Sequence, residues 1–444
     1  MAARELLEPG AVAETNPRTD AADLRTTQRN VRVCFYLYFA RAVQNAMVTR
    51  DFLDLYLFHL SHSNEFVGQV ESARGGAALV MIAPIGFLID RLNRRQMLWG
   101  LTVLKFFTTL LCCIAVASDS LALLFPALVL RRIVEGALDQ SLEVFLVDNV
   151  PEAERRTQIF SRKEMLTWSG AAVGPLLALI LILAHALAGG AGGSTAGWSL
   201  ALLRIVIEFG LLSYFVVDLA VFLLHAVDNE CGSVQSRREG GEPPDWTNAK
   251  VCFVRKRWLI PIWTDLIWAA TQIAGSFSMT YVSLFLRKDF GVGPTVLMLI
   301  RFFENAGLAL MNLVTPKITA RVGRGWAAVF FVFSGAVLMF IFAVSRSAWI
   351  AAASFVLRTA LARANVPCMQ SIIYECVSAR HRGRWSAITS FKAVTNGAGA
   401  WLGGWLADQT GDYRTGFELT ATVHCASAFL LIPVALWLPR ESRA

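Results

Sequence analysis

The sequence has few charged residues and lacks the cysteine patterns of a disulfide-stabilised or zinc-binding protein. Only 17% of its 444 residues are charged, whereas 55% are hydrophobic. A soluble protein of this length needs more polar residues to cover its surface, so the apolar residues must face lipid. The eight cysteines form no CxxC pair and lie mostly inside apolar runs. They are expected to be small buried side chains, and no metal site is expected.

The motifs of ATP hydrolysis and of common catalysis are also missing. The chain contains no Gly-X-X-X-X-Gly-Lys loop, no His-Glu-X-X-His and no Gly-X-Ser-X-Gly. We therefore expect neither an enzyme nor a bound cofactor. The first thirty residues lack an apolar stretch behind a basic start, so no cleavable signal peptide is expected.

Apolar segments of membrane-spanning length fill most of the chain. A helix needs about 20 apolar residues to cross the hydrocarbon core of a bilayer. Windows of that length predict twelve spans, near residues 33–59, 66–89, 97–118, 121–148, 162–187, 201–225, 259–285, 294–316, 326–345, 348–376, 387–408 and 417–438. The first of these is the weakest, because Arg41, Arg50, Asp51 and Asp54 interrupt it.

The distribution of Lys and Arg predicts the orientation of these spans. If the N-terminus is cytoplasmic, the outside connections hold only Arg287, Lys288, Arg346 and Arg414, and the inside connections and tails hold many more. This bias follows the positive-inside rule. It predicts that both termini are cytoplasmic, and it explains the net charge of +8 without a nucleic-acid partner.

The second half of the chain repeats features of the first half about 230 residues later. Val129-Leu130-Arg131 recurs as Val356-Leu357-Arg358, and the pair Glu71 and Arg74 recurs with exchanged signs as Arg301 and Glu304. The sequence thus predicts an all-α polytopic membrane protein with twelve transmembrane helices in two pseudo-symmetric six-helix bundles. The expected organisation is a disordered cytoplasmic tail (1–32), a first bundle (33–225), a cytoplasmic linker (226–258), a second bundle (259–438) and a cytoplasmic C-terminal tail (439–444).

Three motifs resemble signatures of the major facilitator superfamily. Residues 86–95, at the end of the second span, read Gly-Phe-Leu-Ile-Asp-Arg-Leu-Asn-Arg-Arg. They resemble the loop signature Gly-X-Leu-X-Asp-Arg-X-Gly-Arg-Arg/Lys, with Asn93 in place of a glycine, and Asn also tolerates left-handed turns. The fourth span has Arg132-X-X-Glu135-Gly136, similar to the family's Arg-X-X-Gln-Gly. Residues 170–175 of the fifth span match only the centre of the antiporters' Gly/Pro signature.

The resemblance implies a cytoplasmic gate formed by Gly86, Asp90, Arg91, Arg94 and Arg95. In the family this cluster acts as a latch that stabilises the outward-open state. A purely topological role for the basic residues is the alternative, but an acidic residue inside the run serves no topological purpose.

A stripe of charges on the fourth span is the strongest candidate for chemistry within the membrane. Arg131, Arg132, Glu135, Asp139 and Glu143 share one face of a helix. A charge that faces lipid costs at least about 2.5–3.5 kcal/mol, so the stripe should face a neighbouring helix or a wet cavity. Arg132 and Glu135 could form a proton-responsive pair. A static salt-bridge network between spans is the alternative.

Further candidates follow from the resemblance, in which the first, fourth, seventh and tenth spans line the cavity. Each of them could instead be a satisfied structural residue, but three arginines that point inward favour a polar or anionic solute. The candidate cavity and coupling residues are Arg41, Gln44, Asn45, Arg131, Arg132, Glu135, Asp265, Gln272, Arg358 and Asn365. Glu71 with Arg74, and Arg301 with Glu304, are spaced to pair within their own helices.

The function expected from these features is secondary transport of a small organic solute by alternating access. Energy would come from a proton or substrate gradient, or the carrier would be facilitative. The expected partners are the solute, the lipid bilayer and, if transport is coupled, protons, and the chain is expected to be a monomer. A transporter fold that serves as a receptor or scaffold, or a lipid or drug exporter, remains as an alternative.

Overall fold

The computed structural model of the chain describes residues 17–48, 51–91, 93–149, 153–187, 199–224, 245–251, 253–377 and 392–439. The first half contains α1 (Pro17–Val48), α2 (Asp51–Ser61), α3 (Asn64–Arg91), α4 (Arg94–Ala117), α5 (Leu121–Asp148), α6 (Ala153–Leu187), α7 (Leu200–Asp218) and the short 3-10 helix η2 (Leu219–Leu223). A second 3-10 turn, η3 (Asp245–Asn248), and a small hairpin of β1 (Lys250–Val251) and β2 (Val254–Arg255) follow. The second half contains α9 (Lys256–Met279), α10 (Val282–Phe290), α11 (Pro294–Val322), α12 (Arg324–Val344), α13 (Ala348–Cys376), α15 (Lys392–Thr410) and α16 (Arg414–Trp437).

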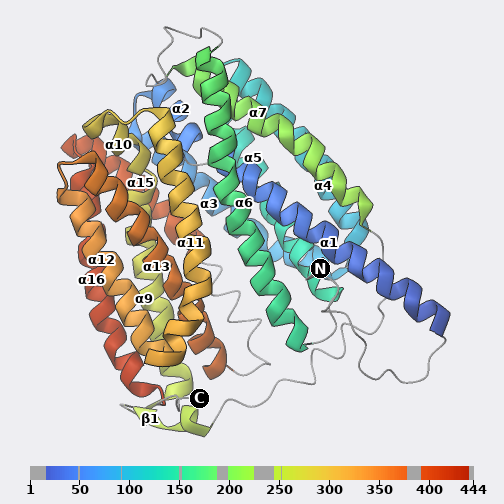
Figure 1. Cartoon of the computed structure of the whole chain (residues 1–444), viewed down its shortest axis with the longest axis vertical. Coiled ribbons are helices and arrows are strands. Elements are labelled where there is room, and N and C mark those ends of the chain that lie inside the picture. Colours follow the sequence, from blue (N-terminus) through green and yellow to red (C-terminus); the bar gives the residue numbers. More distant parts are fainter. Residues whose placement is uncertain are drawn as a thin grey trace.

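The helices form two bundles that approach each other at one end (Figure 1). We call the end with α2 and α10 the upper end and the end with the β1–β2 hairpin the lower end, as they lie in Figure 1. α6 packs against α11, and α3 packs against α15, so two helix pairs join the halves. Toward the lower end α6 and α11 diverge (Figure 1).

Each half contains a short helix near the upper end. α1 ends at Val48 and α2 begins at Asp51, while α9 ends at Met279 and α10 begins at Val282. The two short helices, α2 and α10, occupy corresponding places in the repeat, and they contact each other. The halves therefore meet at a matched pair of short helices.

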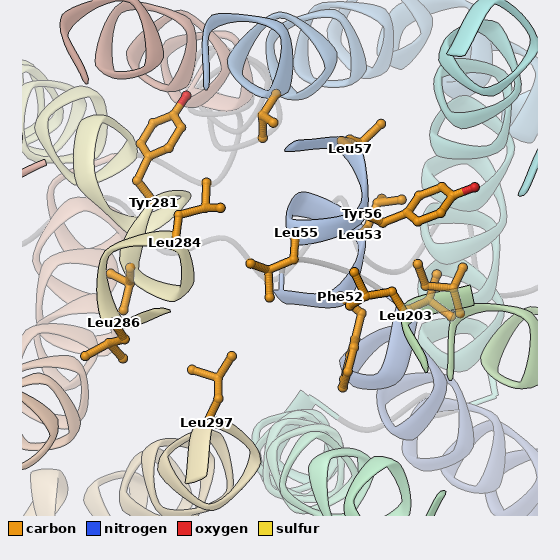
Figure 2. Close-up of a cluster of buried hydrophobic side chains, with 14 of the residues drawn as sticks. Phe52, Leu53, Leu55, Tyr56, Leu57, Leu203, Tyr281, Leu284, Leu286 and Leu297 are labelled. Atoms are coloured by element: carbon orange, nitrogen blue, oxygen red, sulfur yellow. The ribbon is translucent and has the colours of Figure 1, made fainter. Parts of the chain in front are cut away.

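A hydrophobic cluster fills the space around these short helices. Phe52, Leu53, Leu55, Tyr56 and Leu57 of α2 belong to the same buried cluster as residues 282 and 284–286 of α10. In Figure 2, Leu55 and Leu284 extend into the space between the two helices. Burial of apolar side chains stabilises a contact by about 25 cal/mol per Å². The halves are thus joined at the upper end by a continuous apolar core.

Glycines allow several helices to approach closely. A Cβ on Gly404 of α15 would lie 2.4 Å from the Asn64 carbonyl oxygen of α3, and one on Gly403 would lie 2.3 Å from the Phe277 carbonyl oxygen of α9. Gly170 of α6 likewise packs on the backbone of α1, where its Cβ would lie 2.4 Å from the Phe39 carbonyl oxygen. The glycines that follow Trp401 on α15 thus let the helix backbones approach closely.

Most predicted spans correspond to helices, and α5 and α13 have the predicted bounds. Within the described ranges, six helical segments are long and apolar enough to cross a membrane: 95–117, 162–187, 200–223, 294–322, 324–344 and 414–437. The prediction of a disordered tail is wrong for residues 17–32, because α1 begins at Pro17. Asn30 is fully buried there and donates to Asn149 at 3.0 Å, so α5's lower end supports this extension. The predicted linker is also ordered in part, since Trp246 packs on the second half's core.

Candidate functional site

A buried charged cluster joins the two halves at the upper end. Asp51, the first residue of α2, accepts from Arg301 of α11 at 2.5 and 2.9 Å and from the hydroxyl of Ser283 of α10. Arg301 also donates to Glu304 at 2.7 Å, one turn along its own helix. All four side chains are buried. Burial removes the hydration of both charges, so a buried ion pair is stable only when hydrogen bonds replace the contacts with water. The hydrogen bonds to Asp51 and Arg301 do so here.

A second polar contact joins α15 to the start of α3. The Asp408 carboxylate accepts from the backbone N–H of Asn64 at 3.2 Å and of Glu65 at 2.8 Å, and from the Asn64 side chain at 2.5 Å. A carboxylate at a helix N-terminus satisfies orphan N–H groups and interacts favourably with the helix dipole. Tyr281 donates to the carbonyl of Ala400 at 2.6 Å, and Tyr413 donates to the Asn64 side chain at 2.7 Å. We refer to residues 51–65, 281–304 and 400–413 together as the upper seam.

Within the first half, two cations share one buried carboxylate. Arg41 of α1 donates to Asp218 at the end of α7 at 3.0 and 3.1 Å, and Lys105 of α4 lies 2.8 Å from the same carboxylate. Arg41 also reaches Asp139 of α5 at 3.4 Å. Four helices are thereby tied to one charged centre, and Arg41 contacts carboxylates rather than standing free in a cavity.

A second pair lies beside this centre on α5. Glu135 accepts from Arg131 at 2.8 Å, and the guanidinium of Arg131 stacks 4.4 Å from the ring centre of Tyr214. The Tyr214 hydroxyl donates to Asn45 of α1. The predicted pairing of Glu135 with Arg132 is corrected here, because Arg131, four residues before Glu135 on the same helix, makes the ion pair. Arg132 is exposed.

The charges of this first-half network balance. Three cations (Arg41, Lys105 and Arg131) lie among three carboxylates (Glu135, Asp139 and Asp218). The arrangement matches the static salt-bridge network that was the alternative to a proton-responsive pair. The two terminal nitrogens of Arg131, and both polar atoms of Gln44 on α1, are nevertheless buried without a hydrogen-bond partner.

The second half contains a buried arginine of a different kind. Arg358 of α13 is only 6% exposed, and no carboxylate in the described part of the chain pairs with it. Its Nη1 lies 2.9 Å from the sulfur of Met279, and its Nε has no partner. The Oδ1 of Asn365, two turns along the same helix, is also buried without a partner.

The two remaining predicted cavity residues of the second half lie on α9, which packs against α13. Asp265 is buried on α9, and Gln272 is half-buried two turns further along the same face of that helix. Arg363 of α13 lies over the ring of Trp168 of α6, with 5.6 Å between the guanidinium carbon and the ring centre. This contact crosses between the halves, so α13 faces α6 at that level.

Most of the predicted gate lies outside what the structure describes. The structure describes the backbone of four of the five predicted gate residues, in α3 and α4, but not their surroundings: Gly86, Asp90, Arg91 and Arg94. Arg95 is half-buried over the ring of Trp99, at 4.3 Å. Asn93 caps α4 by accepting from the Arg95 N–H at 3.1 Å, with φ −60°. The asparagine therefore acts here as a helix cap and not through a left-handed turn.

Sequence reasoning missed the partners of several charged residues. Lys105 is the only charged residue of its predicted span, and Asp218 is the only one in the second half of its own span. The cost of burying such a charge without a counter-ion was the signal that could have paired them. Asp51 was noted only as a weakness of the first span. Its partner Arg301 was expected to pair with Glu304 alone. Both intrahelical pairs, Glu71 with Arg74 and Arg301 with Glu304, are confirmed.

One carboxylate outside the spans has a shifted pKa. Asp119 lies in the turn between α4 and α5, where it accepts from the Tyr56 hydroxyl at 2.6 Å and pairs with Arg204. The Tyr56 hydroxyl and the Arg204 guanidinium lower the pKa of Asp119 below its ordinary value.

Comparison with known proteins identifies the architecture. The sequence model of the Major Facilitator Superfamily matches residues 34–391. None of the curated proteins matches the chain in sequence. Among solved structures, a mutant of the nucleoside transporter NupG is 16% identical, with a TM-score of 0.65 over 91% of this chain and 99% of that one.

Two other solved structures share the same fold. The human organic anion transporter MFSD10 (TETRAN) is 14% identical, with a TM-score of 0.61 over 91% of this chain and 99% of that one. A variant of the Escherichia coli fucose:proton symporter FucP is 14% identical, with a TM-score of 0.58 over 92% of this chain and 99% of that one. Identities this low show a common fold and carry no information on the solute.

Proposed function

The chain belongs to the Major Facilitator Superfamily, and we propose that it is a secondary transporter that moves a small organic solute by alternating access. Transporters of this architecture hold the solute between two bundles that rock against each other. The observation that carries the proposal is the upper seam. It joins the halves through a buried ion pair, Asp51 with Arg301, and a helix cap, Asp408 on α3, whereas α6 and α11 diverge at the lower end.

We assign the upper end to the outside and the lower end to the cytoplasm. The predicted positive-inside orientation supports this, because it leaves the β1–β2 hairpin and both termini inside. The order of helices supports twelve membrane segments in two six-segment halves, with α1 and α2 forming one segment and α9 and α10 another. In this orientation the structure corresponds to a state that is closed to the outside.

The energy source divides the proposal into two versions. In the proton-coupled version, one carboxylate of the first-half network (Glu135, Asp139 or Asp218) gains a proton and releases its cation during the cycle. Asp139 is the best placed of the three, because its side chain is 55% exposed while those of the other two are buried. In the facilitative version the network stays ionised and serves only as a structural tie.

Flux through the purified protein in proteoliposomes tests the proposal. Solutes selected by thermal-shift screening should enter the vesicles in a saturable way, and an imposed proton gradient should drive accumulation only in the coupled version. A solute that binds saturably but never crosses would favour the receptor or scaffold alternative. Flux confined to lipids or amphipathic drugs would favour the exporter alternative.

A further inference from the structure

Arg358 is the one feature of the candidate site whose charge the described protein leaves unbalanced. Each other buried arginine of the described spans has a carboxylate against its guanidinium: Arg41, Arg74, Arg131 and Arg301. Arg358 has only the sulfur of Met279 at 2.9 Å. A thioether is a weak acceptor and carries no charge, so it does not neutralise the guanidinium.

The charged groups around Arg358 do not supply the missing anion. Arg363 lies one turn away on the same helix and adds a second positive charge. His424 of α16 is also within electrostatic range, and its Nδ1 lies 2.8 Å from the carbonyl of Thr420. Glu304 is the nearest acidic group, but Arg301 binds it at 2.7 Å. None of these groups is a carboxylate that pairs with Arg358.

A buried charge without a counter-ion is unfavourable in a membrane protein, and such residues usually face a solute pathway. The neighbouring polar atoms support this interpretation. The Nε of Arg358, the Oγ1 of Thr359 and the Oδ1 of Asn365 are all buried without hydrogen-bond partners on α13. Arg358 and Asn365 lie on the same face of α13, so a ligand with an anionic group and a further polar atom would satisfy both.

We propose that the transported solute is a small organic anion and that Arg358 binds its carboxylate. This inference rests on the proposed transport function. Guanidinium donors form a planar fork that matches the two oxygens of a carboxylate, and Arg358 presents Nε and its terminal nitrogens for such a contact. Arg358 is thus a substrate-binding residue, and its charge selects the class of solute.

Arg358 lies beside the break between α9 and α10, and this break connects it to the upper seam. Its partner Met279 is the last residue of α9, and Tyr281, two residues further on, donates to Ala400 within the seam. A carboxylate that draws the guanidinium away from Met279 acts directly on the segment that holds the seam closed.

A thermal-unfolding assay on the detergent-purified full chain tests the assignment. The probes are benzoate, lactate, succinate and a wider panel of monocarboxylates and dicarboxylates, each beside its neutral amide. At least one carboxylate should raise the unfolding midpoint in a saturable way while its amide does not, because a ligand that binds only the folded state stabilises it. Arg358→Gln should weaken that binding at least tenfold. Arg346→Gln, which removes an exposed arginine from the turn between α12 and α13, should bind as the unmodified protein does.

The unfolding midpoint without ligand separates a binding role from a packing role. Because Arg358 has no counter-ion, Arg358→Gln should leave the midpoint unchanged or raise it. A lower midpoint, equal stabilisation by carboxylates and amides, no stabilisation by any carboxylate, or unchanged binding in Arg358→Gln would each overturn the assignment. Carboxylate binding without flux would refute transport and leave the anion site standing. Flux of a neutral solute that Arg358→Gln does not affect would support transport and refute the anion site.

Discussion

Replacing Asp51 by Asn should open the upper seam. The substitution keeps the size of the side chain but removes the charge that Arg301 contacts at 2.5 and 2.9 Å. Arg301 retains Glu304, so the guanidinium is not left without a counter-ion. The change therefore acts mainly on the contact between the halves.

The size of the effect follows from the burial of the pair. Removing one partner of a buried ion pair costs about 3–5 kcal/mol, and the remaining Glu304 contact favours the lower value. The Asp51–Arg301 contact exists only when the seam is closed. About 3 kcal/mol is thus lost from the closed state alone, which raises the ratio of open to closed molecules roughly 100-fold.

Alkylation of a cysteine placed in the seam measures that ratio. Leu284→Cys puts a thiol on α10, where the leucine is 2% exposed and extends toward α2 (Figure 2). A membrane-impermeant maleimide should modify it much faster in the Asp51→Asn background. Asp289→Asn is the matched control, because Asp289 pairs with Arg414 at 3.0 Å on the same side of the protein but within the second half. Equal rates in all three backgrounds would refute the role of Asp51 in closure.

Two further substitutions probe the first half. Asp218→Asn should lower the free energy of unfolding by about 3 kcal/mol. The substitution leaves Lys105 without a carboxylate partner and leaves Arg41 with only the longer contact to Asp139. An unchanged thermal midpoint would contradict this prediction. Asp119, whose pKa is lowered in the folded protein, should stabilise it above pH about 4 and lose that contribution as the pH falls through the folded-state pKa. The midpoint of the unmodified protein should therefore fall more steeply below pH 4 than that of Asp119→Asn, and parallel curves would show that the carboxylate contributes nothing.

The fold was accessible from the sequence because apolar length and charge placement have direct physical meaning in a bilayer. The spans that correspond to α5 and α13 are flanked by polar residues in the sequence, and their limits were predicted residue for residue. The start of α1 was not, because residues 17–32 are polar and a hydropathy window cannot detect a helix that extends beyond the membrane. The bond from Asn30 to Asn149, which anchors that extension, joins residues far apart in the sequence.

The candidate site was only partly accessible, because pairing across the bundle depends on helix rotation. Hydropathy located the charged stripe on α5 but could not decide whether Arg131 or Arg132 turns toward Glu135. The internal repeat drew attention to Arg301 and Glu304, yet it gave no sign that Asp51 would complete the cluster from the other half. Arg358 was identified as a candidate from the family resemblance, which implies that the tenth span lines the cavity. Its lack of a counter-ion could be recognised only once its neighbours were known.

Distance measurements between spin labels on the protein in lipid nanodiscs test alternating access most directly. One pair of labels sits at the upper end, at His62 and Asp412, and a second pair sits at the lower end, at Asn93 and Val322. All four positions are exposed turn or helix-end residues. The account predicts two distances for each pair, and Asp51→Asn should lengthen the upper distance while shortening the lower one. A single distance for each pair, unchanged by Asp51→Asn, would contradict it.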